Sequence, residues 1–270
     1  MLIVKDISLS FGAARILHRV QLQARAGELQ VIMGANGAGK STLLRVIAGE
    51  YMQYTGSIFL NGKELRSVPV NEQARLRAVL SQQLSLQLPF PVAEVAGMGR
   101  YVYRAGENKF DKEIVAYALK LLQVYDLRHR AYTTLSGGQQ QRVQMARVLA
   151  QLLETPDLQG TDYTGRKMLL LDEPVTGMDI LHQQLSLQLA TRLAEQGVLV
   201  LAVLHDFQLA AAYAQHIALL KDGHVHAQGP ADRVLTPEHI KACFGVEVSV
   251  LHHPLCTYPM LVTNKNMLTI

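Results

Sequence analysis

Several short apolar runs along the chain are bordered by segments with helical periodicity. Leu29–Met33, Met168–Leu171 and Val198–Leu204 contain almost no polar residue, and Ile180–Gln196, between the last two, has a helical pattern. Strands that are apolar throughout are typical of parallel sheets, because helices cover both faces of such a sheet. The pattern therefore predicts an α/β fold with buried parallel strands.

Further helices and two tight turns are predicted elsewhere. Ser41–Ala48 places its apolar side chains on one helical face, and Asp111–Tyr125 and Gln139–Leu153 are helical over longer stretches. Asn61-Gly62 is a strong hairpin signal, because both residues adopt positive φ readily. Lys221–His224 predicts a second hairpin turn.

Three stretches carry weaker patterns. Leu2–Leu9 favours short strands, Glu154–Arg166 is polar and rich in turn residues, and residues 231–270 are the least regular part of the chain. We expect Glu154–Arg166 to form a surface loop.

Composition places the chain among ordinary globular proteins. Of its 270 residues 49% are apolar, and 26 basic against 22 acidic side chains give a net charge of +4. This length and apolar fraction are enough for a substantial core and exclude global disorder. The small positive excess does not indicate a nucleic-acid partner, and two cysteines, Cys243 and Cys256, make no disulfide framework.

The chain carries no predicted membrane span and no predicted secretory leader. Its best apolar run, Val198–Leu204, is far shorter than the roughly 20 residues that cross a bilayer. Met1–Asp6 lacks the basic segment and the long apolar stretch of a signal peptide. We therefore expect the chain to be cytoplasmic.

A glycine-rich segment directly follows the first buried strand. Gly34-Ala35-Asn36-Gly37-Ala38-Gly39-Lys40-Ser41 has the spacing G-x-x-x-x-G-K-S. Glycines let backbone N–H groups wrap around a phosphate, and the helix that follows presents its positive end to the same anion. In this pattern Lys40 reaches the terminal phosphates and Ser41 supplies a hydroxyl ligand for Mg²⁺. The strand before it and the helix after it favour a nucleoside triphosphate site over a glycine-rich turn without a ligand.

A second glycine pair begins the predicted helix Gln139–Leu153. In Leu135-Ser136-Gly137-Gly138-Gln139, Ser136 is a good N-cap, and the two glycines expose backbone N–H groups at the positive end of the helix. Taken alone, the segment is explained equally well as an ordinary capped helix start. Beside a phosphate loop, a second anion site without a lysine of its own is the stronger hypothesis.

Two carboxylates end the buried strand Met168–Leu171. Asp172 offers the hard oxygen donors that Mg²⁺ prefers, and Glu173 is placed to act on an attacking water as a general base. Paired acids at a strand end can also be a simple helix cap, so this pair alone decides nothing. Thr176–Asp179 follows and predicts a turn next to the site.

Two further polar residues end predicted strands. His205 follows Val198–Leu204, and Gln82 follows Ala78–Ser81. Ligands bind at the carboxyl ends of strands in open α/β sheets, so His205 is a candidate γ-phosphate contact and Gln82 a candidate for Mg²⁺ or the water. Taken singly, a histidine on a strand is usually structural, and the glutamine would be unremarkable.

The order of these motifs resembles that of the ATP-binding subunits of ABC transporters, over about residues 1–230. The matching motifs are Phe11 at the adenine-stacking position, Gly34–Ser41 as Walker A, Gln82 as the Q-loop, Ser136–Gln139 as the signature, Met168–Asp172 as Walker B, Glu173 as the catalytic glutamate, Asp179 in the D-loop and His205 as the switch histidine. As a set these motifs are highly specific. The D-loop reads Thr176-Gly177-Met178-Asp179 where the family usually has Ser-Ala-Leu-Asp, and Phe11 replaces the commoner tyrosine.

The resemblance implies a fold and a division into domains. The fold would be a P-loop NTPase (RecA-like) core with a parallel sheet, an N-terminal antiparallel β-subdomain and an inserted α-helical subdomain. Residues 1–230 would form the nucleotide-binding domain, with the helical subdomain at about 83–153. Residues 231–270 would form a short C-terminal extension.

The resemblance also implies an ATPase that works as a head-to-tail homodimer with ATP between the subunits. ATP binding would favour the closed dimer, and hydrolysis would release it. The residues expected to bind ATP are Phe11, Asn36, Gly37, Ala38, Gly39, Lys40, Ser41 and Thr42, with Ser136, Gly137, Gly138, Gln139 and Asp179 of the opposite subunit. Ser41, Gln82 and Asp172 would hold Mg²⁺, and Glu173, His205 and Gln82 would act in hydrolysis.

Partners and location follow from the same resemblance. The transport pathway would belong to two multi-span permease subunits, which a periplasmic substrate-binding protein serves, and the chain would be peripheral at the cytoplasmic face of the bacterial inner membrane. The family docks its membrane subunit on the segment Gln82–Arg104. The apolar residues that could line a docking groove there, or else pack inside the helical subdomain, are Leu84, Leu86, Leu88, Phe90 and Pro91.

Within the family, Pro91–Arg100 resembles the importers of large chelates, which carry haem, iron siderophores or cobalamin. Haem (hemin) is favoured by the insertion Glu154–Arg166, by Phe244–Val248 and by the tail His252-His253-Pro254. The same role for a siderophore or cobalamin is the alternative. A soluble ABC ATPase acting on nucleic acid or the ribosome is less favoured, because such proteins usually carry two nucleotide domains or long coiled coils.

A histidine and cysteine group near the end of the sequence is a weak metal candidate. His252, His253 and Cys256 could be combined with Cys243, but their spacing fits no standard zinc pattern. A surface or packing role is therefore the favoured interpretation.

Overall fold

The computed structural model describes residues 1–81, 86–103, 108–158, 163, 167–251 and 253–264. The chain forms two compact units, residues 1–67 with 201–270, and residues 68–200. In the described ranges, every helix is too short or too polar to cross a membrane.

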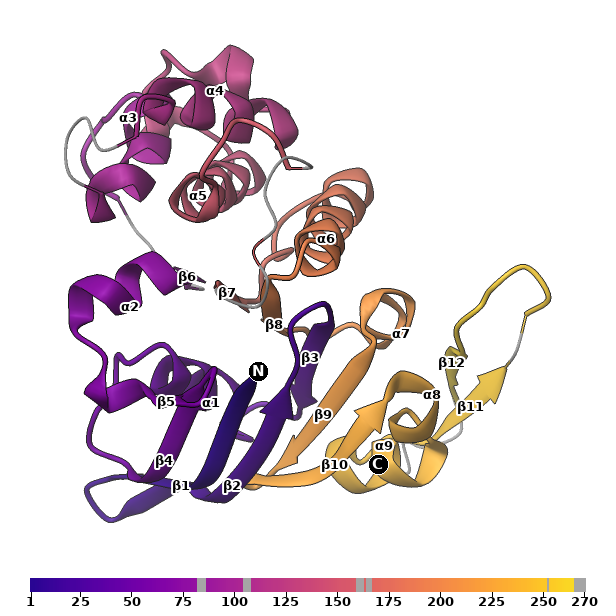
Figure 1. The fold of residues 1–270 in the computed structure, drawn as a ribbon. Helices are drawn as coiled ribbons and strands as arrows, with labels where there is room; N and C mark the ends of the chain where they lie inside the picture. Colours follow the sequence, from indigo (N-terminus) through magenta and orange to yellow (C-terminus); the bar gives the residue numbers. More distant parts are fainter. Residues whose placement is uncertain (82–85, 104–107, 159–162, 164–166, 252, 265–270) are drawn as a thin grey trace. The chain divides into compact units, whose positions relative to one another are not determined.

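The first unit begins with an antiparallel sheet in the order β2-β1-β4-β5 (Figure 1). Its strands are β1 (Leu2–Phe11), β2 (Ala14–Ala24), β4 (Thr55–Leu60) and β5 (Lys63–Glu64), and the short 3-10 helix η1 (Leu65–Ser67) follows them. The predicted Asn61-Gly62 turn joins β4 to β5, with φ of 51° and 81°. The prediction of short strands at the N-terminus was wrong in extent, because β1 runs unbroken to Phe11 through several register shifts.

The same unit contains three strands that carry the phosphate loop and its support. β3 (Leu29–Gly34) pairs in parallel with β9 (His216–Lys221), and β9 pairs antiparallel with β10 (His224–Pro230). Every residue of β3 is buried, as its apolar run predicted. Helix α1 (Lys40–Ile47) follows the loop after β3.

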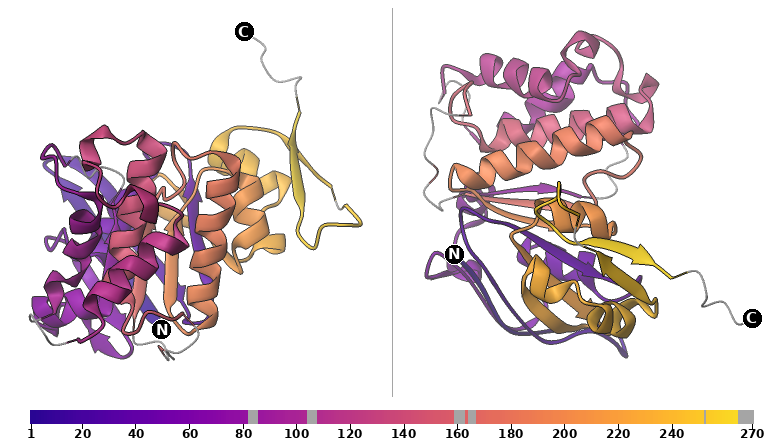
Figure 2. Two further views of the ribbon diagram at one scale, coloured as in Figure 1. Left: turned by 90° about the horizontal axis from the view of Figure 1, so that it is seen from above. Right: turned by 90° about the vertical axis from the view of Figure 1, so that its right-hand side faces the viewer.

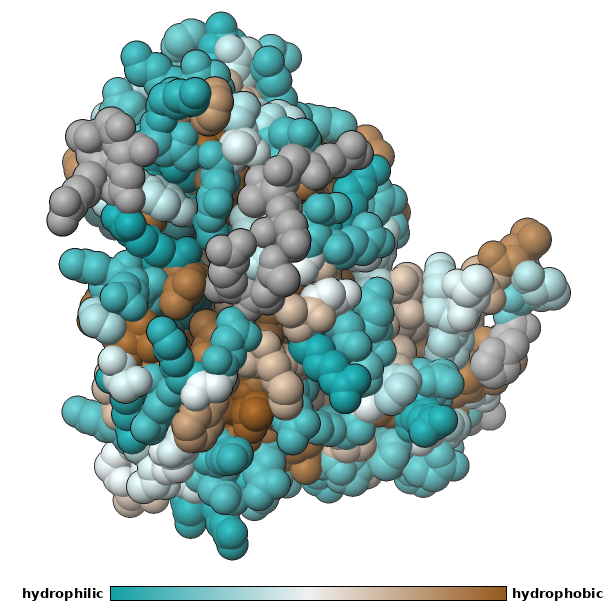
Figure 3. All heavy atoms as spheres, viewed as in Figure 1, coloured by the Kyte–Doolittle hydropathy of each residue, from teal (hydrophilic) through white to brown (hydrophobic). Residues whose placement is uncertain are grey.

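The remaining elements of the first unit lie towards the C-terminus. They are α7 (Phe207–Tyr213), α8 (Ala231–Val234), α9 (Pro237–Phe244), β11 (Val248–Leu251) and β12 (Met260–Thr263). This stretch is more regular than the sequence indicated, because its helices and strands are too short for a clear period. β11 and β12 form an antiparallel hairpin that extends from the helices (Figure 2), and its far end is apolar (Figure 3).

The second unit is mainly helical. Its helices are α2 (Val70–Leu76), α3 (Val92–Gly97), α4 (Asp111–Leu121), α5 (Gly137–Leu152) and α6 (Ile180–Glu195), with 3-10 turns η2 (Met98–Val102), η3 (Tyr125–Leu127) and η4 (Tyr132–Thr134). Helices α3, α4 and α5 pack against one another (Figure 1). The helices predicted at Asp111–Tyr125 and Gln139–Leu153 are therefore confirmed, with shifted ends.

Two strands of the second unit are parallel neighbours. β6 (Arg77–Leu80) pairs with β7 (Met168–Asp172), and all of β7 is buried. β8 (Leu199–Val203) is shared by the two units: the Leu199 N–H donates to the Lys167 carbonyl in the second, and the Leu204 N–H donates to the Ile32 carbonyl in the first.

The predicted surface loop Glu154–Arg166 is only partly exposed. Its described residues form no helix or strand, but Leu158 and Tyr163 are buried. Buried parallel strands, covering helices and an N-terminal antiparallel sheet confirm the predicted fold class.

Candidate active site

The phosphate-loop backbone depends on glycine. Gly34, Gly37 and Gly39 have φ of 156°, 81° and 95°, which side chains disfavour. A Cβ on Gly34 would lie 2.3 Å from the Leu220 carbonyl oxygen of β9. The loop therefore packs directly on the neighbouring strand, and Asn36 and Gly37 form its exposed crest.

Lys40 lies within this loop as the first residue of α1. Its side chain is buried, and Nζ donates to the carbonyls of Gly34 and Ala35 at 3.0 Å each. The ammonium group is thus held on the concave backbone where phosphate oxygens would be bound. Ser41 and Thr42 follow in the first turn of α1 and are half-buried.

The turn between β9 and β10 supports the phosphate loop. The Gly223 N–H donates to the Ala38 carbonyl at 3.2 Å, and the His18 N–H of β2 donates to the Gly223 carbonyl at 2.9 Å. A Cβ on Gly39 would lie 2.9 Å from Leu17 Cδ2, so β2 also lies close beneath the loop. The predicted hairpin turn Lys221–His224 is confirmed and has a role in holding this backbone.

Phe11 ends β1 with 47% of its surface exposed. Its ring meets that of Tyr51 edge to face, with centroids 5.2 Å apart. The exposure of the Phe11 ring suits the predicted adenine contact.

His205 comes directly after β8. The hydrogen bond from the Leu204 N–H to the Ile32 carbonyl aligns this end of β8 with the end of β3, where the phosphate loop begins. The His205 side chain is exposed, and Asp206 caps α7 by accepting from the N–H groups of Gln208 and Leu209. The imidazole at the end of β8 therefore lies at the same edge of the sheet as the end of β3, where the phosphate loop begins.

In the second unit, the predicted signature forms the N-terminus of α5. Ser136 and Gln139 make a reciprocal capping box: the Gln139 N–H donates to Ser136 Oγ at 3.4 Å, and the Ser136 N–H donates to Gln139 Oε1 at 3.0 Å. Ser136 and Gly137 are exposed. The cap predicted for Ser136 is confirmed: it takes up the Gln139 N–H, and the exposed Gly137 lies at the positive end of the helix.

Asp172 is the last residue of the buried strand β7, and Glu173 follows it. Asp172 is 1% exposed, whereas Glu173 is half-buried and has φ of 51°. The Thr176 hydroxyl donates to Glu173 Oε2 at 3.3 Å, and the Thr176 N–H donates to the Glu173 carbonyl. The turn thus fixes the direction of the Glu173 carboxylate.

The turn that contains Asp179 packs against the signature. A Cβ on Gly138 would lie 2.8 Å from the Gly177 carbonyl oxygen. Asp179 caps α6 by accepting from the His182 N–H at 3.0 Å and contacts His182 Nδ1 at 2.7 Å. These bonds lower the pKa of the Asp179 carboxyl below its usual value, and the Arg142 guanidinium adds to the effect.

Sequence reasoning missed a link between the signature helix and the Glu173 turn. Gln141 Nε2 of α5 lies 3.5 Å from the Glu173 carbonyl and 3.4 Å from the Pro174 carbonyl. Gln141 and Arg142 stand three and four residues after Gly138, which puts them on the helix face that meets the turn. This spacing from Gly138 was the signal in the sequence that could have revealed the link between α5 and the Glu173 turn.

The structure gathers the predicted residues in two groups, one in each unit. Phe11, the phosphate loop and His205 belong to the first unit, whereas the signature, Asp172 with Glu173, and Asp179 belong to the second. Gln82 and Leu84 lie outside the described residues, so their roles stay predictions.

The histidine and cysteine group was a weak metal candidate. His252 lies outside the described residues, and among those described no three His, Cys, Asp or Glu side chains are grouped to hold a metal ion. Cys243 is buried, which raises the pKa of its thiol.

Comparison with known proteins places the chain in a family. The ABC transporter family pattern matches residues 17–176. Curated relatives named hemin import ATP-binding protein are 43% identical in Pseudomonas entomophila, over 97% of this chain and all of the relative, and 43% identical in Gloeobacter violaceus, over 97% and 94%.

Solved structures agree. The dimeric bacterial ABC transporter cassette MJ0796 is 25% identical with a TM-score of 0.72, covering 86% of this chain and 99% of that one. An inward-facing ABC transporter is 22% identical with a TM-score of 0.74, covering 98% of each chain, and shows the same fold. The chain thus belongs to the ABC transporter family, as one of its ATP-binding and ATP-hydrolysing subunits.

Proposed function

We propose that this chain is the ATPase subunit of a bacterial haem importer. The observation that carries the proposal is its identity with hemin import ATP-binding proteins along nearly the whole chain, including the C-terminal part beyond the ABC family match. Importers of different chelates share their ATPase machinery, so similarity outside the shared motifs is what favours haem over a siderophore or cobalamin.

ATP would be bound by the phosphate loop of one subunit. The loop N–H groups and Lys40 would hold the phosphates, with Phe11 on the adenine ring. A γ-phosphate would compete with the carbonyls of Gly34 and Ala35 for the Lys40 ammonium. The predicted loop contacts are Asn36, Gly37, Ala38, Gly39, Ser41 and Thr42.

The residues offered for Mg²⁺ fit that ion chemically. The Asp172 carboxylate and the Ser41 hydroxyl are hard oxygen donors, and a carboxylate at the end of a buried strand is favoured when a cation is bound to it. When bound, Mg²⁺ would offset negative charge on the terminal phosphates. Gln82 is proposed as a further ligand.

Hydrolysis would be carried out by Glu173. Its carboxylate, oriented by Thr176, would accept a hydrogen bond from the attacking water and draw its proton. His205 would hold the γ-phosphate, and Lys40 would stabilise the charge that develops on it.

The site would be completed by a second copy of the chain. The exposed signature residues Ser136 and Gly137 would offer the Ser136 hydroxyl and the Gly137 N–H to the γ-phosphate of ATP bound to the other subunit. Ile180 and Leu181, directly after Asp179, are 77% and 66% exposed. Exposed apolar side chains beside the D-loop support a homodimer interface there.

A membrane permease would dock on the second unit. A groove of about 520 Å³ lies between α3 and α4, and both apolar and charged residues line it. Its apolar lining is Ala93, Gly97, Val115, Ala116 and Leu119. Tyr101, in the adjoining η2, is 78% exposed. Ala93, Gly97 and Arg100 of the predicted segment Gln82–Arg104 lie in the groove lining, which supports docking on that segment. The predicted liners outside it are Leu86, Leu88, Phe90 and Pro91. The chain would then be peripheral at the cytoplasmic face of the inner membrane.

The test is reconstitution in liposomes with a haem-importer permease and its periplasmic binding protein. We expect the haem-loaded binding protein to stimulate ATP hydrolysis by the liposome-bound complex. Stimulation by a siderophore-loaded or cobalamin-loaded binding protein but not by haem would overturn the substrate. Failure to assemble with any permease would overturn the importer role.

A further inference from the structure

A polar pocket of about 170 Å³ lies in the first unit, where β3 and β9 begin. Every side chain in its lining is polar: Gln23, Arg25, Glu28, Gln30, His216 and Gln228. Most ligand pockets are lined predominantly by apolar side chains, so this one suits a small and charged occupant rather than an apolar one. The phosphate loop begins at the opposite end of β3, so the polar pocket is separate from the ATP site.

The sheet supplies the floor of the polar pocket. Gln30 and His216 are register partners in the parallel strands β3 and β9, so their side chains stand next to each other on one face of the sheet. The starts of these strands are tied together: the Leu29 N–H donates to Gln215 Oε1 at 2.7 Å, and the Gln215 N–H donates to the Leu29 carbonyl at 3.0 Å. The floor is therefore organised in advance of any ligand.

Two polar groups of this floor have no hydrogen-bond partner. Gln30 is 3% exposed, yet its side-chain amide makes no hydrogen bond with the residues that the structure describes. His216 Nδ1 is also buried; it lies 3.0 Å from Glu28 Oε2 but outside hydrogen-bond geometry, and it has no partner elsewhere in the described ranges. Buried polar groups are nearly always hydrogen-bonded, so these two point to a polar molecule from outside the chain.

One tight turn brings two opposite charges to the polar pocket. Arg25 and Glu28 flank the turn Ala26-Gly27, in which Gly27 has φ of 87°. A β-turn places its first and fourth Cα atoms within about 7 Å of each other, so both charged side chains reach the same small space. Within the described part of the chain Arg25 has no ion-pair partner, whereas Glu28 contacts His216. A ligand that carries both a carboxylate and an ammonium group could therefore bind to Arg25 and Glu28 at once.

We propose that the polar pocket binds a small zwitterion of the α-amino-acid class. The carboxylate of the ligand would accept two hydrogen bonds from the Arg25 guanidinium, and its ammonium group would donate to the Glu28 carboxylate. The Gln30 amide, which has both donors and an acceptor, would bond the ligand from the floor. One cation and one carboxylate in the lining favour a zwitterion over a ligand with a net charge. This inference goes beyond the proposed haem import and does not depend on it.

The test is a thermal-shift screen of the full chain with the common L-amino acids, each at a concentration on the order of 10 mM, followed by calorimetry. Two analogues of each amino acid that binds serve as matched ligands. The α-hydroxy acid keeps the carboxylate but lacks the ammonium group, and the amino-acid amide keeps the ammonium group but lacks the carboxylate. We expect one site per chain, with and without ATP, and about 10–100-fold weaker binding of each analogue, because each loses a charged hydrogen bond.

Three substitutions locate the site. Arg25→Gln and Glu28→Gln should each weaken binding about 10–100-fold, and Gln30→Leu, which removes the amide at similar volume, should also weaken it. Arg19→Gln is the matched control, because Arg19 lies on β2 outside the pocket lining, with a side chain that is 78% exposed. It should keep the wild-type affinity. Wild-type affinity for ATP in every variant would show that a loss of amino-acid binding does not come from misfolding.

Three results would overturn the inference. The first is that no amino acid binds in the screen. The second is that the hydroxy acid binds as tightly as the amino acid, which would make the polar pocket a site for anions. The third is that Arg25→Gln and Glu28→Gln both keep full affinity, which would place the ligand elsewhere on the chain.

Discussion

The first turn of α5 contains two neighbouring glycines with different surroundings. A Cβ on Gly138 would lie 2.8 Å from the Gly177 carbonyl oxygen and 3.6 Å from Met178 Cα, whereas one on Gly137 would meet nothing within 4 Å. Both glycines have ordinary helical backbone, so alanine is permitted at each. The pair of substitutions Gly137→Ala and Gly138→Ala thus isolates the contact between the signature and the D-loop turn.

The two variants should differ in stability by a predictable amount. Alanine in place of glycine in a helix gains about 0.5–1 kcal/mol at either position. At Gly138 the new Cβ must move from 2.8 Å to an ordinary contact distance, which displaces the backbone at Gly177. Overpacking of this kind costs about 1–3 kcal/mol. We therefore expect Gly137→Ala to stabilise the chain. Its free energy of unfolding should exceed that of Gly138→Ala by about 1–3 kcal/mol.

Urea unfolding without nucleotide measures this difference and leaves ATP contacts out of the comparison. Hydrogen exchange of the amides at 176–179 should become faster in Gly138→Ala only, because only that variant displaces the turn. Equal unfolding midpoints and unchanged exchange in both variants would refute the close packing of Gly138 on Gly177.

Four other outcomes are expected. Lys40→Ala should weaken ATP binding, measured by calorimetry, by about 10–100-fold, because it removes a charged hydrogen-bond donor. If the variant bound ATP with wild-type affinity, Lys40 would be excluded from the site. Glu173→Gln should bind ATP and form a stable dimer in size exclusion, with turnover down about 10²–10⁴-fold; an unchanged rate would refute its role. Burial and the nearby His239 lower the pKa of His226, so the folded chain favours the neutral imidazole. The free energy of unfolding should therefore be highest above about pH 6.5, the usual histidine pKa, and decline as the pH falls through the lowered pKa. Unfolding curves of His226→Gln should show a smaller decline. Burial, which raises the pKa of Cys243, should make its alkylation slow at pH 8 in the native chain and fast in urea, as peptide mass spectrometry would show.

The parts of the fold that the sequence predicted correctly depend on local signals. β3 and β7 are apolar in sequence because both of their faces are buried, and the phosphate loop is recognisable because Gly34 and Gly39 have backbone that other residues disfavour. The same holds for the Ser136 cap, whose partners lie within four residues. Such features need no knowledge of the remaining fold.

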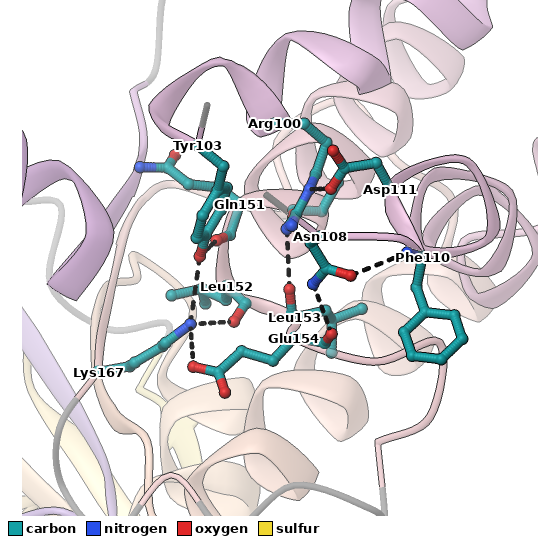
Figure 4. A network of polar contacts seen from close by, with 11 residues as sticks. Arg100, Tyr103, Asn108, Phe110, Asp111, Gln151, Leu152, Leu153, Glu154 and Lys167 are labelled. Carbon is teal, nitrogen blue, oxygen red and sulfur yellow. Dashed lines mark hydrogen bonds and ion pairs between the residues drawn. The ribbon is translucent and has the colours of Figure 1, made fainter. Parts of the chain in front are cut away.

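The features that sequence reasoning missed depend on distant partners. Arg100 and Lys167 would be assigned to the surface by residue type, yet both are buried, because the carbonyls at the end of α5 and the carboxylates of Asp111 and Glu154 compensate them (Figure 4). Their carbonyl partners at Leu153 and Leu152 lie 53 and 15 residues away, and no periodicity reports such a pairing. Similarly, α8 and β11 have four residues each and are defined by packing rather than by pattern.

The catalytic role proposed for Glu173 would explain why a glutamate occupies an unfavourable backbone conformation in this chain. Its backbone has φ of 51°, a conformation in which asparagine or glycine would be less strained. Neither of those residues could supply a carboxylate to a water molecule, whereas glutamate can. The turn accepts the strain because Thr176 holds the backbone and the side chain of Glu173, and Gln141 reaches the same carbonyl from α5. The strained residue is therefore supported from the helix that carries the signature, so any movement of α5 must also act on the orientation of the Glu173 carboxylate.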